Sequence, residues 1–131
     1  MKRAAIILVL LATAGCEMIV PPWKVASLEE KADQPVTCAA GADCDEKWGR
    51  ARQWVRKHSR LQIEKQTDSL LQTAKSLNLS PDVAFVITKV PQGNDTYLIT
   101  YQADCDDWMG CDPALLKLKA SFVNFVMYGK K

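Results

Sequence analysis

Residues 84–103 read AFVITKVPQGNDTYLITYQA, and this stretch decides the fold of the chain. Its first half is rich in β-branched and aromatic residues, which favour strands. Its second half places apolar side chains at every second position from Tyr97 to Ala103, as one face of a strand does. The intervening Pro91-Gln-Gly-Asn-Asp95 has the composition of a turn. The sequence therefore predicts an antiparallel hairpin with strands over 84–90 and 97–103.

A helix is expected before this hairpin, over residues 44–58. Trp48, Ala51 and Val55 recur with the spacing of one helical face. Asp43 and Glu46 precede them in the form of a capping box, with Asp43 as the N-cap. Basic residues follow at 56–58, where they suit the negative end of the helix dipole.

A second helix is expected after the hairpin. Asp112 has the character of an N-cap, and Pro113 suits the first helical position. A broad apolar face follows from Leu115 to Val126, and Gly129 is the expected C-cap.

The segment between the first helix and the hairpin supports two interpretations. Alternating side chains predict a strand over about 60–72, with a turn near 78–82. Leu70, Leu71, Ala74 and Leu77 recur with helical spacing, so a short helix over 68–77 is the alternative. With the strand, the element order is α-β-β-β-α, which predicts one α+β domain over 38–131. We expect an antiparallel sheet with the helices packed on one face.

The N-terminus has the form of an export signal. Lys2 and Arg3 precede an apolar run from Ala4 to Ala12, which is too short to span a bilayer as a helix. Thr13-Ala-Gly-Cys16 resembles the lipobox of bacterial lipoprotein precursors, with Thr13 in place of the usual Leu. The alternative is ordinary cleavage after Ala12-Thr-Ala14. We expect a signal peptide over 1–15 and a lipid-anchored linker over 16–37, punctuated by prolines, with a short helix over Val25 to Ala32 as an option within it.

The number of cysteines also singles out Cys16. Exported proteins meet oxidising conditions, where cysteines pair, and the chain has an odd number of them. Lipid on Cys16 leaves four cysteines for two disulfides. Of the three connectivities, we favour the local pairs Cys38–Cys44 and Cys105–Cys111, since each loop lies at a predicted helix start.

The chain from about residue 44 to residue 128 also resembles small uncharacterised proteobacterial envelope lipoproteins. The similarity rests on Cys44-x-x-x-Trp48 opening a helix, Trp54-Val55 later in it, and Cys111-x-Pro113 before a Phe-rich helix. It implies a location at the periplasmic face of the outer membrane, but no reaction.

Few residues suggest a catalytic, redox or metal-binding site. The two C-x5-C units lack the spacing of zinc or thiol–disulfide redox sites, and His58 is the only histidine. The acidic run DCDDWMGCD at 104–112 lacks the calcium spacing of an EF-hand, so we interpret it as a solvated loop. Trp108 and Met109 within it are candidate contacts to a partner. We expect no metal and no cofactor.

Charge argues against nucleic acid as a partner. Lys2 and Arg3 account for two of the 17 basic residues, which leaves 15 basic and 15 acidic side chains after the signal. The sequence therefore predicts a non-catalytic envelope lipoprotein, held by its N-terminal lipid and binding another envelope protein or polymer. The alternatives are a soluble periplasmic protein, or an accessory or enzyme acting on envelope polymer.

Overall fold

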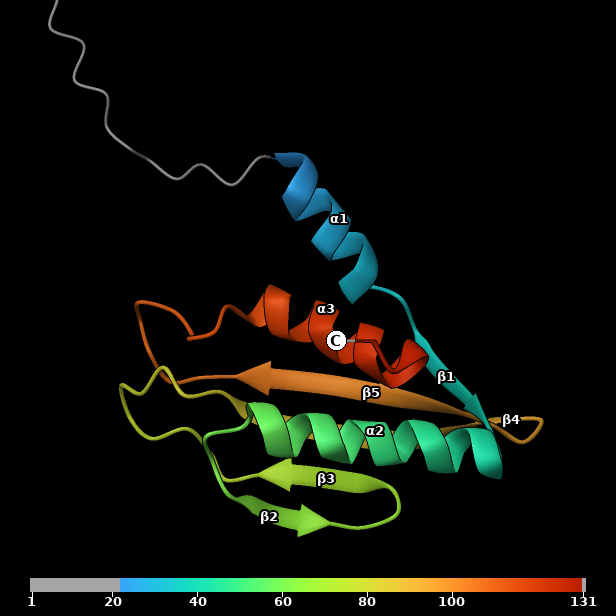
Figure 1. Cartoon of the computed structure of the whole chain (residues 1–131). Helices are drawn as coiled ribbons and strands as arrows, with labels where there is room; N and C mark the ends of the chain where they lie inside the picture. The colour runs from blue at the N-terminus through green and yellow to red at the C-terminus, as the bar shows by residue number, and fades with distance from the viewer. Residues whose placement is uncertain (1–21, 131) are drawn as a thin grey trace, which may run out of the picture.

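A computed structural model describes residues 22–130 and has the expected α+β architecture, with three helices and a five-stranded antiparallel sheet (Figure 1). The signal segment, Cys16 and the first part of the linker lie outside the described residues. The strands are arranged in the order β1-β5-β4-β3-β2. The helices are α1 (Pro22–Ala32), α2 (Ala42–His58) and α3 (Leu115–Tyr128); the strands are β1 (Val36–Ala39), β2 (Ile63–Gln66), β3 (Leu70–Thr73), β4 (Ala84–Gly93) and β5 (Thr96–Asp104).

The core lies between one face of the sheet and the helices α2 and α3 (Figure 1). Alternation buries every second side chain in β1, β3 and the first half of β4, while the intervening residues are half-buried or exposed. In β5 only Ile99 is fully buried. Trp54 of α2 lies at the centre, with Phe85 and Phe122 edge-on at ring-centroid distances of 5.4 and 5.3 Å. Each such aromatic pair adds about 1 kcal/mol beyond the burial of its surface.

The predicted hairpin is confirmed, and its strands are longer than expected. β4 and β5 pair from Ala84 and Asp104 to Gly93 and Thr96, with a register irregularity near Pro91. Asn94 and Asp95 take positive φ angles of 52° and 54° in the turn, a conformation that Asn and Asp tolerate better than most residues.

The single strand predicted over 60–72 is wrong, and so is the helix offered as its alternative. The chain forms two short strands, β2 and β3, joined by a tight turn at Thr67. The Thr67 hydroxyl accepts hydrogen bonds from the backbone N–H groups of Ser69 (3.2 Å) and Leu70 (2.9 Å). Alternation continues through this turn, so the pattern does not reveal it.

The segment assigned to the linker contains the whole of α1 and the start of β1. α1 packs against α3, and β1 pairs with the first half of β5. Val36 and Thr37, which the linker interpretation left outside the domain, therefore belong to the sheet.

Both predicted helix starts differ in the structure. α2 begins at Ala42 with Gly41 as its N-cap, so Asp43 is not the cap, and Glu46 pairs with Arg50. α3 begins at Leu115, after a cis Asp112–Pro113 peptide bond, so these two residues do not open the helix. The predicted C-cap is confirmed, because Gly129 takes the left-handed conformation (φ 67°) and its N–H donates to the Phe125 carbonyl at 2.8 Å.

Candidate functional site

The two local disulfides are confirmed, and they lie at opposite ends of the sheet (Figure 1). Cys38–Cys44 ties β1 to the first turn of α2, and both residues are buried. Cys105–Cys111 closes the loop that leads from β5 towards α3, and both residues are half-buried. The cysteines are 4.9 and 5.6 Å apart at Cα, within the ordinary range for disulfides.

Large apolar side chains are exposed at the end of the domain that holds the second disulfide. The exposed fractions are 84% for Trp108, 78% for Met109, 73% for Leu77 and 65% for Leu79. Trp108 and Met109 lie in the loop 105–114, and the two leucines lie in the loop 74–83 between β3 and β4. We call these four side chains the apolar tip. Trp108 and Met109 were predicted as candidate contacts, whereas the two leucines were not.

Hydrogen bonds join the two loops that carry the apolar tip. The Asp106 N–H donates to the Ser76 hydroxyl at 3.3 Å, and the Asp112 N–H donates to the Pro81 carbonyl at 3.1 Å. Arg60 adds a third link, because its guanidinium lies 3.2 Å from Asp82 and 3.5 Å from Asp112. These two carboxylates raise the pKa of Arg60.

The loop 105–114 also fixes its own conformation around Trp108. The Asp107 carboxylate accepts the Met109 N–H at 2.9 Å, and the Asp107 carbonyl accepts the Gly110 N–H at 3.1 Å. Together with the disulfide, these bonds hold the exposed side chains on an ordered loop. A partner therefore loses less backbone freedom on binding here than on a loose loop.

The surroundings of the apolar tip are acidic. Asp104, Asp106 and Asp107 form no ion pair within residues 22–130, and Asp82 and Asp112 share Arg60. Over the same residues, no group of three His, Cys, Asp or Glu side chains is arranged to hold a metal ion. These carboxylates form an acidic rim beside the apolar tip.

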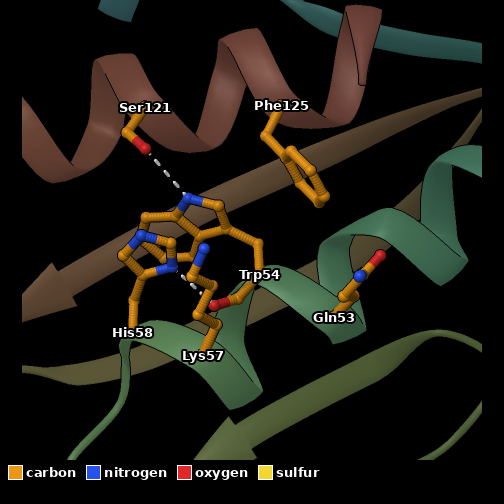
Figure 2. Close-up of a pocket in the computed structure, with 6 residues that line it drawn as sticks. All are labelled: Gln53, Trp54, Lys57, His58, Ser121 and Phe125. Atoms are coloured by element: carbon orange, nitrogen blue, oxygen red, sulfur yellow. Dashed lines mark hydrogen bonds between the residues drawn. The ribbon is translucent and has the colours of Figure 1, made fainter. Parts of the chain in front are cut away.

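A separate crevice lies between α2 and α3 (Figure 2). It has a volume of about 250 Å³ and is lined by Gln53, Trp54, Lys57, His58, Ser121 and Phe125. His58 stacks on Trp54 at a ring-centroid distance of 4.1 Å, and the Trp54 indole N–H donates to the Ser121 hydroxyl at 3.1 Å.

This crevice does not have the geometry of a hydrolase triad. His58 Nδ1 lies 2.8 Å from the Trp54 carbonyl, which only accepts, so Nδ1 carries the hydrogen. Among the described residues no carboxylate orients this imidazole, and no hydrogen bond joins it to Ser121. The sequence did not predict the crevice, because its residues come from two helices that are distant in the chain.

The basic residues of α2 are largely engaged within the domain. Arg50 donates to the carbonyls of Val126 (3.2 Å) and Met127 (3.4 Å), where it satisfies the C-terminal end of α3. Arg56 donates to the side chain of Gln66 at 3.1 Å. Arg50 and Arg56 therefore have partners within the domain.

Comparisons with protein-family models, curated proteins and solved structures found no match to this chain. From residue 22 to residue 130, no helix combines the length and apolar character needed to cross a membrane.

Proposed function

We propose that this protein is a non-catalytic envelope lipoprotein, held at a membrane through Cys16, that binds another envelope protein through the apolar tip. The observation that carries the binding surface is the exposure of Trp108 (84%) and Met109 (78%) on a disulfide-closed, hydrogen-bonded loop. Burying one such side chain against a partner contributes about 1.5–3 kcal/mol. Trp is also prominent among the residues that dominate binding energy at interfaces.

The acidic rim favours a protein with basic residues around an apolar pocket. Anionic lipid headgroups attract Lys and Arg side chains. The carboxylates of Asp106 and Asp107, beside Trp108, repel such headgroups. A cationic rim on a partner protein would complement these carboxylates and guide its approach.

Cysteine pairing supports the anchor. Four of the five cysteines form the two disulfides, which leaves Cys16 without a cysteine partner in its own chain. Five residues separate Cys16 from Pro22 at the start of α1, so the two are at most about 21 Å apart when this segment is fully extended. A lipid on Cys16 would therefore hold α1 close to the membrane surface.

Mass spectrometry of the mature N-terminus tests the anchor. A diacylated or triacylated Cys16 is expected at the N-terminus, and Cys16→Ser should release the protein from the membrane fraction. An unmodified Gly15 terminus would instead identify a soluble exported protein.

Site-specific photocrosslinking in the envelope tests the binding surface. A photoreactive residue at Trp108 or Met109 should give an adduct of one defined mass, and purified mature domain should compete for it. The same domain with Trp108→Ala should not compete. The matched control is the reactive residue at Gln92, which is exposed on the β4–β5 hairpin. Equal adducts at positions 108 and 92 would contradict the proposed surface.

A further inference from the structure

Half of β5 has no neighbouring strand on one side. β4 pairs with β5 along its whole length, but β1 pairs only with residues Thr96 to Ile99 (Figure 1). Pro35 precedes β1 and has no backbone N–H, so the ladder cannot continue through it as a hydrogen-bonded strand. Residues 100–104 therefore present a free edge about 14 Å long, on which every second residue directs its N–H and C=O away from β4.

A groove follows this free edge, between β5 and α3. Two adjoining cavities of about 260 and 420 Å³ share Tyr101 and Lys119 in their walls. The first reaches the connection between α1 and β1, and the second reaches Ala103, Leu115 and Leu116. Side chains that point to one face of an added strand recur about 7 Å apart, so successive ones can enter these two cavities.

Tyr101, which lines both cavities, also carries a hydroxyl without a partner within residues 22–130. The Tyr101 hydroxyl is buried and makes no hydrogen bond within the described part of the chain. Burial also raises the pKa of this hydroxyl, so it stays protonated and can donate. A buried donor without an acceptor is costly, so this hydroxyl lowers the stability of the domain.

We propose that this edge and groove bind an extended peptide segment of a partner protein, which adds to the sheet as a strand beside residues 100–104 of β5. The peptide's backbone satisfies the free edge, and its alternate apolar side chains fill the two cavities. A peptide carbonyl or carboxylate accepts from the Lys119 ammonium, which belongs to the wall of both cavities. A lipid chain has no N–H groups, so it cannot pair with the carbonyls of a strand edge. This inference does not depend on the anchor or on the apolar tip.

The test uses a displayed library of random heptapeptides and the mature chain carrying Cys16→Ser. The most enriched sequence is then made as a synthetic peptide, and its affinity is measured by fluorescence anisotropy. We expect a consensus with apolar residues at alternate positions. Ala103→Phe, which fills one cavity, should weaken binding at least about tenfold. Two separate control variants should leave binding unchanged. Glu64→Phe adds the same ring to the exposed edge strand β2, and Trp108→Ser alters the apolar tip.

Two further measurements distinguish a loss of peptide binding from misfolding of the variant. Tyr101→Phe should raise Tm, because it removes a buried unpaired hydroxyl, and should leave binding within about twofold, because this hydroxyl is not exposed in the groove. Amide hydrogen exchange on the unsubstituted mature chain should show new protection at residues 100–104 when the peptide is bound.

Three outcomes would overturn the inference. The first is equal affinity of the peptide for the chain with and without Ala103→Phe. The second is protection at residues 105–110 without protection of β5. The third is a dimer in solution whose β5 edge is already protected without peptide, because the occupant would then be a second copy of the chain.

Discussion

The two disulfide loops have the same spacing and opposite roles. Each closes a C-x5-C unit beside the end of a strand. Cys38–Cys44 lies inside the core, near buried Trp48. Cys105–Cys111 lies at the surface and carries exposed Trp108. Trp48 follows the first loop four residues after Cys44, and Trp108 lies within the second loop, three residues from each cysteine. Closeness to a disulfide therefore does not determine whether an aromatic ring is buried or exposed.

The difference arises from where the next helix begins relative to each loop. α2 starts within the first loop, so its first turns fold Trp48 down onto the sheet, where the indole N–H donates to the Thr67 carbonyl at 3.3 Å. Lys89 of β4 lies 5.6 Å from the ring centroids of both Trp48 and Tyr97, which closes this end of the core. In the second loop α3 begins only after the disulfide, at Leu115, so no helix directs Trp108 towards the sheet.

The two tryptophans give the largest expected contrast. Trp48→Ala removes a ring from the core and should lower the free energy of unfolding by about 4 kcal/mol. Trp108→Ala removes an exposed ring and should change it by less than about 0.5 kcal/mol. Urea unfolding followed by circular dichroism measures both. A loss above 1 kcal/mol for Trp108→Ala would mean that this ring packs on the domain.

The disulfides themselves should differ by a smaller amount. Loop closure contributes about 2.4 kcal/mol in each case, because the two loops are equal in length. Cys38→Ala with Cys44→Ala also removes two buried sulfur atoms, so we expect a total loss of about 4 kcal/mol. Cys105→Ala with Cys111→Ala should cost about 2.4 kcal/mol. Equal losses in urea unfolding would show that burial of the first pair adds nothing.

The sequence predicted the elements whose signals are local and long. The hairpin at 84–103, the helix over Trp48 and Val55, and the final helix all have periods that extend over many residues. β1 was missed because four residues are too few to establish alternation. The β2–β3 turn was missed because its signal is the hydroxyl of Thr67, within a run whose alternation continues unchanged.

The surfaces were harder to predict than the elements. Trp108 and Met109 stood out because large apolar residues interrupt an acidic run. Leu77 did not, since its spacing from Leu70 and Ala74 also suits a helix, and Leu79 fell in the turn expected near 78–82. The crevice at His58 and the groove along β5 are formed by residues far apart in the chain, such as Tyr101 and Leu116. No pattern in one segment can reveal which segments meet.

Tyr101 offers a way to separate stability from binding. It belongs to the core aromatic cluster, with Phe122 at a ring-centroid distance of 4.8 Å, yet its hydroxyl has no partner in the described domain. Tyr101→Phe should therefore increase the free energy of unfolding by about 1 kcal/mol. The matched control is Tyr128→Phe, because the Tyr128 hydroxyl is on an exposed side chain and reaches Gln34 at 3.4 Å. A destabilising Tyr101→Phe would mean that the hydroxyl is hydrogen-bonded in solution.

The smallest expected effect concerns the aspartates beside the two disulfides, each of which accepts a hydrogen bond from a backbone N–H. Asp43 accepts the Ala39 N–H at 2.8 Å, as Asp107 accepts the Met109 N–H at 2.9 Å. The Ala39 N–H is the main reason that the pKa of Asp43 is lowered, and Lys47 at 3.2 Å adds to it. A carboxyl whose pKa is lower in the folded state binds its proton more weakly there than in the unfolded chain. Its stabilising effect is therefore complete above the unfolded value near 3.8 and is lost as the pH falls through the folded value.

Asp43→Asn should accordingly cost about 0.5 kcal/mol at pH 7, a small figure because the side chain is 43% exposed and water screens its interactions. That cost should shrink below about pH 4, which urea unfolding between pH 2.5 and 7 would detect. Asp45→Asn is the matched control, since Asp45 lies in the same first turn of α2 and shares the helix dipole without forming an ion pair in the described domain. If both substitutions cost the same at every pH, the helix dipole explains the effect and the bond to Ala39 contributes nothing. A larger, pH-dependent cost for Asp43→Asn would mean that the ionised carboxylate stabilises the buried disulfide loop through Ala39 and Lys47, beyond its interaction with the helix dipole.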